Sequence, residues 1–138
     1  MTDECILKVE TEIPVNFTCA TGTTIEKGAV CAMTDNMVAV LSTGDTDIVA
    51  GIAQSEKLAA ETSQNSVAIY RRGIFSGVAG VAGVVFGEAI ITDASTSSTN
   101  RLVKADNQSE QIMGIALETA TSGNRFLFEL GPRAIQLT

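Results

Sequence analysis

The sequence predicts an all-β domain, mainly antiparallel, that closes into a small barrel or packs as a sandwich. About ten short apolar runs alternate with turn signals spaced roughly eight to twelve residues apart, which is the pattern of such folds. Hydrophobic residues make up 45% of the 138-residue chain and charged residues only 18%, with 12 glycines and no tryptophan. This composition is typical of short strands and tight turns. The length fits one domain with its own core.

The chain consists of two similar halves. Three pairs of glycines recur at nearly constant offsets of 59, 63 and 58 residues: Gly28 and Gly87, Gly51 and Gly114, and Gly73 and Gly131. In each half, a run that contains Gly-Ile-Ala is followed by a polar connection and then by an alternating apolar run. We interpret the pattern as an internal duplication of roughly 60 residues. The pseudo-repeats lie at about residues 25–75 and 84–131, inside a single domain of residues 18–138.

Residues 1–17 precede the first repeat and predict an extended N-terminal arm or an edge strand. Apolar residues alternate loosely with polar ones there, and Pro14 argues against a central strand because proline cannot donate a hydrogen bond to a sheet. Because the arm is separate from the repeats, it is a candidate for reaching a partner molecule. Its apolar side chains are Ile6, Val9, Ile13, Val15 and Phe17.

The first repeat begins at the turn around Gly28 and predicts strands with one short helix. The first two strands form a hairpin, since Asp35 and Asn36 between them are turn residues. The helix is favoured because Ser55 can cap it and the glutamates and alanines that follow favour helix. The expected elements are strands at residues 29–33, 38–41, 48–54 and 67–72 and a helix at residues 55–62.

The second repeat follows a glycine-rich bridge and predicts strands again. Glycines at positions 77, 80, 83 and 87 disfavour a helix in the bridge and suit a strand that approaches its neighbours closely. The polar residues 93–100 supply a longer loop for the second hairpin. The expected strands lie at residues 75–86, 87–92, 101–104, 114–117 and 126–130.

The residue types that metal sites, disulfides and nucleic-acid surfaces need are scarce. The chain has no histidine, and Cys5, Cys19 and Cys31 lack the Cys-x-x-Cys spacing of zinc or redox sites. We interpret the cysteines as buried free thiols of a protein that folds in a reducing cytoplasm. The net charge of −7 argues against binding to nucleic-acid phosphates. We therefore expect no metal, no cofactor and no nucleic acid.

Membrane insertion and catalysis are also disfavoured. The N-terminus is acidic where a signal peptide would be basic, and no apolar run reaches the length of a membrane span. Loop carboxylates such as Asp45 and Asp47 are interpreted as solvated surface charge, since a calcium loop would also need a bidentate glutamate. No cysteine has a histidine base to activate it. We expect a soluble protein made in a cytoplasm that is not an enzyme and has no membrane partner.

Arg71 and Arg72 are the only adjacent basic pair, and they follow Tyr70 at the end of a predicted strand. Two interpretations stay open for them: an ion pair with the abundant carboxylates on the surface, or a contact between subunits. A small acidic β-rich protein without a catalytic constellation is expected to act by binding, often as an oligomer.

Six motifs follow one another in a fixed order over about residues 22–131: Gly28-Ala-Val, Gly51-Ile-Ala, Val67-Ala-Ile-Tyr-Arg-Arg-Gly-Ile-Phe, Phe86-Gly-Glu-Ala-Ile, Met113-Gly-Ile-Ala-Leu-Glu and Phe126-Leu-Phe-Glu-Leu. This order resembles that of the capsid cement proteins of tailed phages, small head decoration proteins that are sometimes mislabelled as recombinases. In that family, a strand ending in Gly-Ile-Ala or Gly-Val-Ala leads to a strand closing on Gly-Val-Phe. A Gly-Asp or Gly-Glu then opens the second half, as Gly87-Glu88 does here.

The resemblance implies a β-barrel or β-tulip-like domain that binds the outer surface of an assembled icosahedral capsid, commonly as a homotrimer. Such proteins stabilise the head against the pressure of its DNA. The implied partner is the major capsid protein, and the implied location is the exterior of the virion. The expected capsid contacts are Ile6, Val9, Ile13, Pro14 and Val15. The expected subunit-interface residues are Tyr70, Arg71 and Arg72.

We expect the N-terminal arm to become ordered only on the capsid, so that deleting residues 1–17 abolishes capsid binding and leaves the domain folded. Two alternative functions stay open: a β domain of a phage tail, baseplate or fibre, and a carbohydrate-binding module. The second is weaker because sugars stack on exposed aromatic side chains, and the chain has only five phenylalanines, one tyrosine and no tryptophan. A small enzyme of an unrecognised type is a third alternative.

Overall fold

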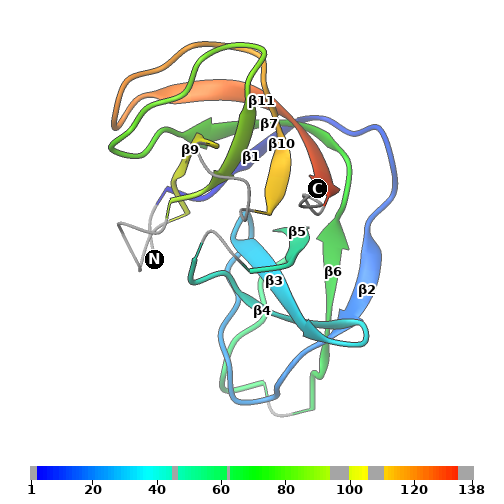
Figure 1. Ribbon diagram of the computed structural model, residues 1–138. Helices are drawn as coiled ribbons and strands as arrows, with labels where there is room; N and C mark the ends of the chain where they lie inside the picture. Colours follow the sequence, from blue (N-terminus) through cyan, green and yellow to red (C-terminus); the bar gives the residue numbers. More distant parts are fainter. Residues whose placement is uncertain (1–2, 45–46, 62, 94–99, 106–110, 134–138) are drawn as a thin grey trace, which may run out of the picture.

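Strands account for the regular secondary structure of the protein (Figure 1). The computed structural model describes residues 3–44, 47–61, 63–93, 100–105 and 111–133. Within these residues there are eleven strands and no helix, which confirms the predicted all-β class. The strands are β1 (Ile6–Val9), β2 (Val15–Thr18), β3 (Val30–Asp35), β4 (Val38–Leu41), β5 (Val49–Ala53), β6 (Ser66–Tyr70), β7 (Gly73–Val78), β8 (Ala89–Thr92), β9 (Leu102–Lys104), β10 (Ile112–Ala116) and β11 (Arg125–Arg133).

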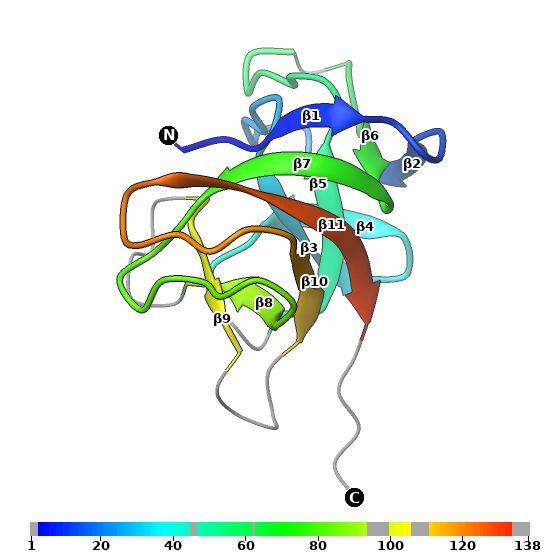
Figure 2. The same ribbon diagram turned by 90° about the horizontal axis from the view of Figure 1, so that it is seen from above.

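The strands form two sheets, which Figures 1 and 2 show from two directions. One is a closed barrel with the order β2-β4-β3-β5-β6, and the other is a six-stranded sheet with the order β1-β7-β11-β10-β8-β9. All neighbouring strands are antiparallel except β2 and β4. The chain passes from the barrel to the sheet between β6 and β7, where Arg71 and Arg72 connect the two strands.

The two halves of the chain pair their strands in the same order. In the first half, β3 pairs with β4 and β5, and β5 pairs with β6, which pairs with β2. In the second half, β8 pairs with β9 and β10, and β10 pairs with β11, which pairs with β7. Each half also has a matching isolated bridge, Ile25 with Lys57 and Val84 with Ala120. The same pairing order therefore occurs in β2–β6 and in β7–β11.

One pair of the recurrent glycines, Gly51 and Gly114, lies where two strands approach too closely for a side chain. A Cβ atom at Gly51 in β5 would collide with the carbonyl oxygen of Tyr70 in β6. A Cβ atom at Gly114 in β10 would collide in the same way with the carbonyl oxygen of Glu129 in β11. Gly51 also has a φ of +145°, which side-chain-bearing residues rarely adopt. The glycine spacing in the sequence therefore reflects one close strand contact that is formed twice.

The main hydrophobic core contains side chains from both halves. Phe75, Phe126 and Phe128 of the six-stranded sheet form ring contacts there, and Tyr70 of the barrel packs edge-on against Phe75 with centroids 5.7 Å apart. A second core fills the barrel around Phe17. The shared core therefore packs the barrel against the six-stranded sheet, and fully burying one such large apolar side chain contributes about 1.5–3 kcal/mol.

The predicted helix at residues 55–62 is wrong. In the structure, Lys57 forms an isolated bridge with Ile25, and their main chains exchange two hydrogen bonds of 2.8 Å. The Lys57 side chain is 0% exposed, and its Nζ donates hydrogen bonds to the carbonyl oxygens of Thr21 and Thr23 at 2.9 and 2.7 Å. These contacts with a distant segment override the local helix propensity. Residue 62 lies outside the described residues.

The N-terminal segment, residues 3–17, belongs to both sheets. β1 pairs with β7 at the edge of the six-stranded sheet, and β2 pairs with β6 inside the closed barrel. Cys5 is buried in the main core and Phe17 in the barrel core. The predicted edge strand therefore describes β1, whereas the chain enters the barrel directly after Pro14. The contacts that residues 3–17 make in the structure are contacts within the chain itself.

Candidate interaction surfaces

The apolar side chains predicted to contact a capsid lie along one continuous outer segment. Ile6 and Val9 belong to β1, Ile13 and Pro14 to the β1–β2 connection, and Val15 to the start of β2. Four of them are exposed, led by Ile13 at 80%, whereas Pro14 is half-buried. Figures 1 and 2 show this blue segment passing along one side of the molecule from the sheet to the barrel.

Contacts with both sheets hold the N-terminal segment in place. The Cys5 amide donates a hydrogen bond of 2.9 Å to the carbonyl oxygen of Gly28. Arg101 Nε pairs with Asp3 Oδ2 at 2.8 Å, and Leu7 packs against the main core. The outward-facing apolar side chains are therefore presented from an ordered backbone, which reduces the entropy lost when a partner binds.

Two of the three residues predicted at a subunit interface face into the molecule. Tyr70 is buried, and its hydroxyl donates a hydrogen bond of 3.0 Å to Oε2 of Glu10 in the β1–β2 connection. Burial and the Glu10 carboxylate both raise the pKa of Tyr70. Arg71 is half-buried, and its Nη1 donates a hydrogen bond of 2.8 Å to the carbonyl oxygen of Ala50. Both side chains therefore hold the chain where it crosses from β6 to β7.

Arg72 is the member of this trio that is exposed to solvent. Its guanidinium group lies against Gly131 in β11. Together with Thr11 and Glu129 it lines a shallow hollow of about 250 Å³. The structure therefore separates the three predicted interface residues, with Arg72 available to a partner and the other two engaged internally.

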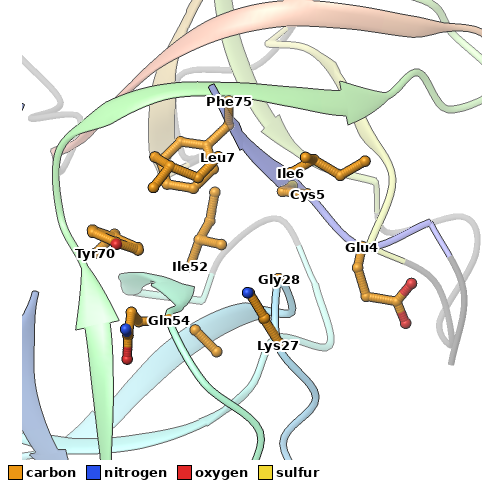
Figure 3. Close-up of a pocket in the computed structure, with 11 residues that line it drawn as sticks. Glu4, Cys5, Ile6, Leu7, Lys27, Gly28, Ile52, Gln54, Tyr70 and Phe75 are labelled. Atoms are coloured by element: carbon orange, nitrogen blue, oxygen red, sulfur yellow. The ribbon is translucent and has the colours of Figure 1, made fainter. Parts of the chain in front are cut away.

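A cavity of about 410 Å³ opens between the N-terminal segment and strands β5, β6 and β7 (Figure 3). Leu7, Ile52 and Phe75 face one another in the close-up, and the Tyr70 ring lies beside them. Lys27 also lines the cavity. The cavity therefore has an apolar wall, and Glu4, Lys27 and Gln54 add polar groups to its lining.

The three cysteines are buried free thiols, as the sequence predicts. Burial raises the pKa of both Cys5 and Cys31 to about 12, which keeps them in the unreactive protonated form at neutral pH. In the part of the chain that the structure describes, no three His, Cys, Asp or Glu side chains are grouped to hold a metal ion. No helix among the described residues is long and apolar enough to cross a membrane.

A second exposed apolar surface lies on the β7–β8 loop and just after β10. This Phe86 surface is defined by Phe86 and Leu117, whose chain neighbours Gly87 and Ala116 share a hydrogen bond of 2.7 Å. Phe86 is 68% exposed, whereas the other four phenylalanines are buried. The local pattern does not reveal it, because the apolar run before Phe86 predicts a strand. A comparison of the two repeats does reveal this surface. Lys27 stands before Gly28 in the first repeat, whereas Phe86 stands before Gly87 in the second.

The sequence matches the protein family described as phage cement protein over residues 9–130. This range runs from the last residue of β1 into β11 and therefore includes strands of both sheets. No curated protein matches the chain.

Among solved structures, the fold is similar to that of the N base of the head fibre gp8.5 in bacteriophage phi29, with a TM-score of 0.53. The two sequences are 18% identical, and the similarity covers 90% of this chain and 98% of that chain. At this identity the likeness concerns the fold, whereas the family match is a match of the sequence itself. Because that match extends over both sheets, the chain belongs to the phage cement protein family and is a structural protein of a phage head.

Proposed function

We propose that the protein binds the outer surface of an assembled icosahedral phage capsid and stabilises it, without a catalytic role. Its partner is the major capsid protein, and its location is the exterior of the virion after synthesis in the host cytoplasm. Membership of the cement family carries this proposal. The similarity to a protein of a phage head fibre agrees with it.

The N-terminal segment supplies a surface that supports capsid binding. Exposed apolar side chains that lie close together mark interaction sites on otherwise polar protein surfaces. Here they are held on an ordered backbone that is anchored in both sheets. The residues that we propose to contact the capsid are Ile6, Val9, Ile13, Pro14 and Val15.

The charge of the protein supports a protein partner rather than the packaged DNA. The net charge of −7 opposes binding to phosphates. It also keeps the protein soluble and free of nonspecific contacts until capsids are present.

We further propose that the protein is a homotrimer on the capsid. Linking three subunits raises the effective concentration of each remaining contact once the first has formed, so each subunit needs only a modest interface. Arg72 is the interface residue that a neighbouring subunit can reach. Tyr70 and Arg71 support that interface indirectly, because they fix the backbone on which Arg72 lies.

The test is co-sedimentation of the purified protein with expanded empty capsids of its own phage, combined with the mass of the protein by light scattering. The expected result is saturable binding at a fixed ratio and a higher temperature of capsid disruption. Unexpanded capsids and an unrelated acidic protein of similar size serve as controls. A protein that stays in the supernatant with every capsid state contradicts the proposal.

A matched pair of variants tests the N-terminal surface. Ile13→Ser removes the most exposed apolar side chain of the segment and is expected to weaken capsid binding. Met37→Ser removes an exposed apolar side chain of the β3–β4 turn and is expected to leave binding unchanged. Equal affinities of the two variants would remove this surface from the proposal.

A second candidate function is a β domain of a phage fibre, tail or baseplate. The observation that favours it is the similarity to a head fibre base. In that case the protein co-purifies with fibres or tails and not with empty capsids. A glycan array tests the related alternative of carbohydrate binding, for which a saturable signal is the expected result.

A further inference from the structure

The β7–β8 loop, which carries Phe86, lies at the other end of the molecule from the β1–β2 connection. In both Figures 1 and 2, the lime-green β7–β8 loop and the orange β10–β11 turn lie at the left, and the β1–β2 connection lies at the right. Phe86 and Leu117 expose 68% and 47% of their surfaces there. Burying a large aromatic side chain away from water is especially favourable in free energy, so the exposure of Phe86 points to a binding partner.

Hydrogen bonds fix the backbone that carries Phe86. The Phe86 amide donates to Oγ1 of Thr119 at 3.1 Å, and the Gly87 amide donates to the carbonyl oxygen of Ala116 at 2.7 Å. Two residues before Phe86, Val84 forms an isolated bridge with Ala120, and this bridge ties the loop to the β10–β11 turn. An aromatic anchor on a fixed backbone loses little entropy on binding, which is typical of residues that dominate an interface.

The first half of the chain builds the same turn around Gly28. Gly28 and Gly87 have φ values of +86° and +83°. The Gly28 amide donates to the carbonyl oxygen of Ala53 at 2.9 Å, as the Gly87 amide does to that of Ala116. The two turns therefore have equivalent backbones, and their side chains can be compared position by position.

This comparison shows that the apolar side chains are not required by the turn. Lys27 stands in the first half where Phe86 stands in the second, and Gln54 stands where Leu117 stands. The same backbone therefore forms with a charged and a polar side chain at these two positions. The conformation of the turn therefore does not explain why Phe86 and Leu117 are apolar.

In the first half, an extended segment of the chain lies against Gly28, whereas the Lys27 and Gln54 side chains beside it stay exposed. A Cβ atom at Gly28 would collide with the carbonyl oxygen of Cys5 and lie 2.9 Å from Cβ of Glu4. At Gly87, no atom of the described residues, other than its chain neighbours, lies within 4 Å of such a Cβ atom. Among the described residues, the glycine of the turn is therefore covered in the first half and open in the second, where the side chains at the two compared positions are apolar.

We propose that an extended apolar segment of the major capsid protein lies against the Gly87 turn and packs on Phe86 and Leu117, as residues 4–7 lie against the Gly28 turn of the first half. This inference rests on the proposed function. Glu88 and Glu118 are exposed beside Phe86 and Leu117, so a segment with Lys or Arg next to its apolar side chains fits best. Two copies of this chain that met through this surface would bring their Glu88 and Glu118 carboxylates together, and the like charges would repel. The Lys104 amide donates a hydrogen bond to the carbonyl oxygen of Gly83, three residues before Phe86 in the β7–β8 loop.

Two separate apolar surfaces make one copy of the protein bivalent. The N-terminal segment contacts one capsid subunit, and the Phe86 surface holds a segment of a neighbouring one. The second contact forms at a high effective concentration once the first exists, so two weak contacts give tight binding. A molecule that links two capsid subunits in this way opposes their separation.

The double variant Phe86→Lys with Leu117→Gln tests the inference, because it installs the side chains that the first half already tolerates. The expected result is an affinity for expanded capsids that is weaker by about thirtyfold, with an unchanged melting temperature and unchanged mass in solution. Leu58→Gln, at an exposed position in the barrel half, is the matched control and keeps the wild-type affinity. Wild-type affinity of the double variant overturns the inference, whereas failure of the wild type to bind overturns the proposed function itself.

Photo-crosslinking identifies the occupant without relying on a loss of binding. A benzophenone amino acid at position 86 of the full chain, bound to expanded capsids, is expected to crosslink to a segment of the major capsid protein that contains basic residues. A crosslink to a second copy of this chain overturns the assignment. So does dissociation of an oligomer by Phe86→Lys in light scattering.

Discussion

The hydroxyl of Tyr70 donates a hydrogen bond of 3.0 Å to Oε2 of Glu10, and this contact ties the β1–β2 connection to the end of β6. The Tyr70 ring also packs edge-on against Phe75, in the first strand of the second half. One side chain therefore contacts the N-terminal segment, the barrel and the six-stranded sheet. We regard it as the point at which the three parts of the fold are held together.

Tyr70→Phe keeps the ring and removes the hydrogen bond to Glu10. A hydrogen bond to a charged group contributes about 1.5–3 kcal/mol, so the free energy of unfolding is expected to fall by about 1–2 kcal/mol in urea denaturation. A double-mutant cycle with Glu10→Gln measures the pair itself. Effects of the two substitutions that simply add would show that the hydrogen bond does not couple the residues.

Deletion of residues 1–17 is expected to unfold the protein. The sequence predicts a detachable arm, but the structure places Phe17 in the barrel core and most of β2 in the deleted range. Loss of a buried phenylalanine alone costs about 3–5 kcal/mol. Circular dichroism and the dispersion of amide signals in NMR measure the outcome. A folded truncated protein would restore the arm interpretation.

A pair of point variants gives the same test without a deletion. Phe17→Ala is expected to lower the free energy of unfolding by about 3–5 kcal/mol. Ile13→Ala, at a position that is 80% exposed, is expected to change it by less than about 0.5 kcal/mol. Similar values for the two variants would contradict the placement of β2 in the barrel.

Lys57→Ala is expected to destabilise the protein by about 2–4 kcal/mol, because it leaves a cavity and removes the donor to the carbonyl oxygens of Thr21 and Thr23. Lys57→Met keeps the volume of the stem and is expected to cost less. Lys104→Ala, at an exposed position, is the control and should have almost no effect. Equal stabilities of the Lys57→Ala and Lys104→Ala proteins in urea would show that the burial of Lys57 does not contribute to the free energy of unfolding.

The fold was predictable where a physical constraint recurs in the sequence. Gly51 and Gly114 each allow a close contact with a neighbouring strand, so their spacing revealed the two halves. Lys57 was not predictable, because its partners lie more than 30 residues earlier and its neighbours favour helix. The exposure of Phe86 was also hidden, because the apolar run before it predicts a strand, whereas the structure has a loop there.

The two close-contact glycines are expected to respond alike to substitution. Gly51→Ala and Gly114→Ala each force a Cβ atom into a carbonyl oxygen, of Tyr70 and Glu129 respectively. We expect each to lower the free energy of unfolding by about 3 kcal/mol or more, since the backbone of a paired strand must shift. Gly44→Ala, with no atom of the described residues within 4 Å of its Cβ, is the control. A tolerated alanine at either site would contradict the strand contact there.

Stability is expected to fall at alkaline pH. Burial raises the pKa of Cys5 and Cys31 to about 12, from the ordinary thiol value of 9.0. The folded protein therefore keeps thiol protons that the unfolded chain loses, and this contribution to stability is complete below about pH 9 and is lost as the pH rises towards about 12. The raised pKa of Tyr70 acts in the same direction above about pH 10.

The measurement is the melting temperature between about pH 7.5 and pH 10.5, under reducing conditions that prevent disulfide formation. We expect it to fall with rising pH over the upper half of this range for the wild type, and less steeply for Cys31→Ala, which lacks one of the buried thiols. The comparison between the two proteins cancels the titration of lysines and other shared groups. Parallel pH profiles of the wild type and Cys31→Ala would mean that the buried thiol of Cys31 does not control the alkaline loss of stability.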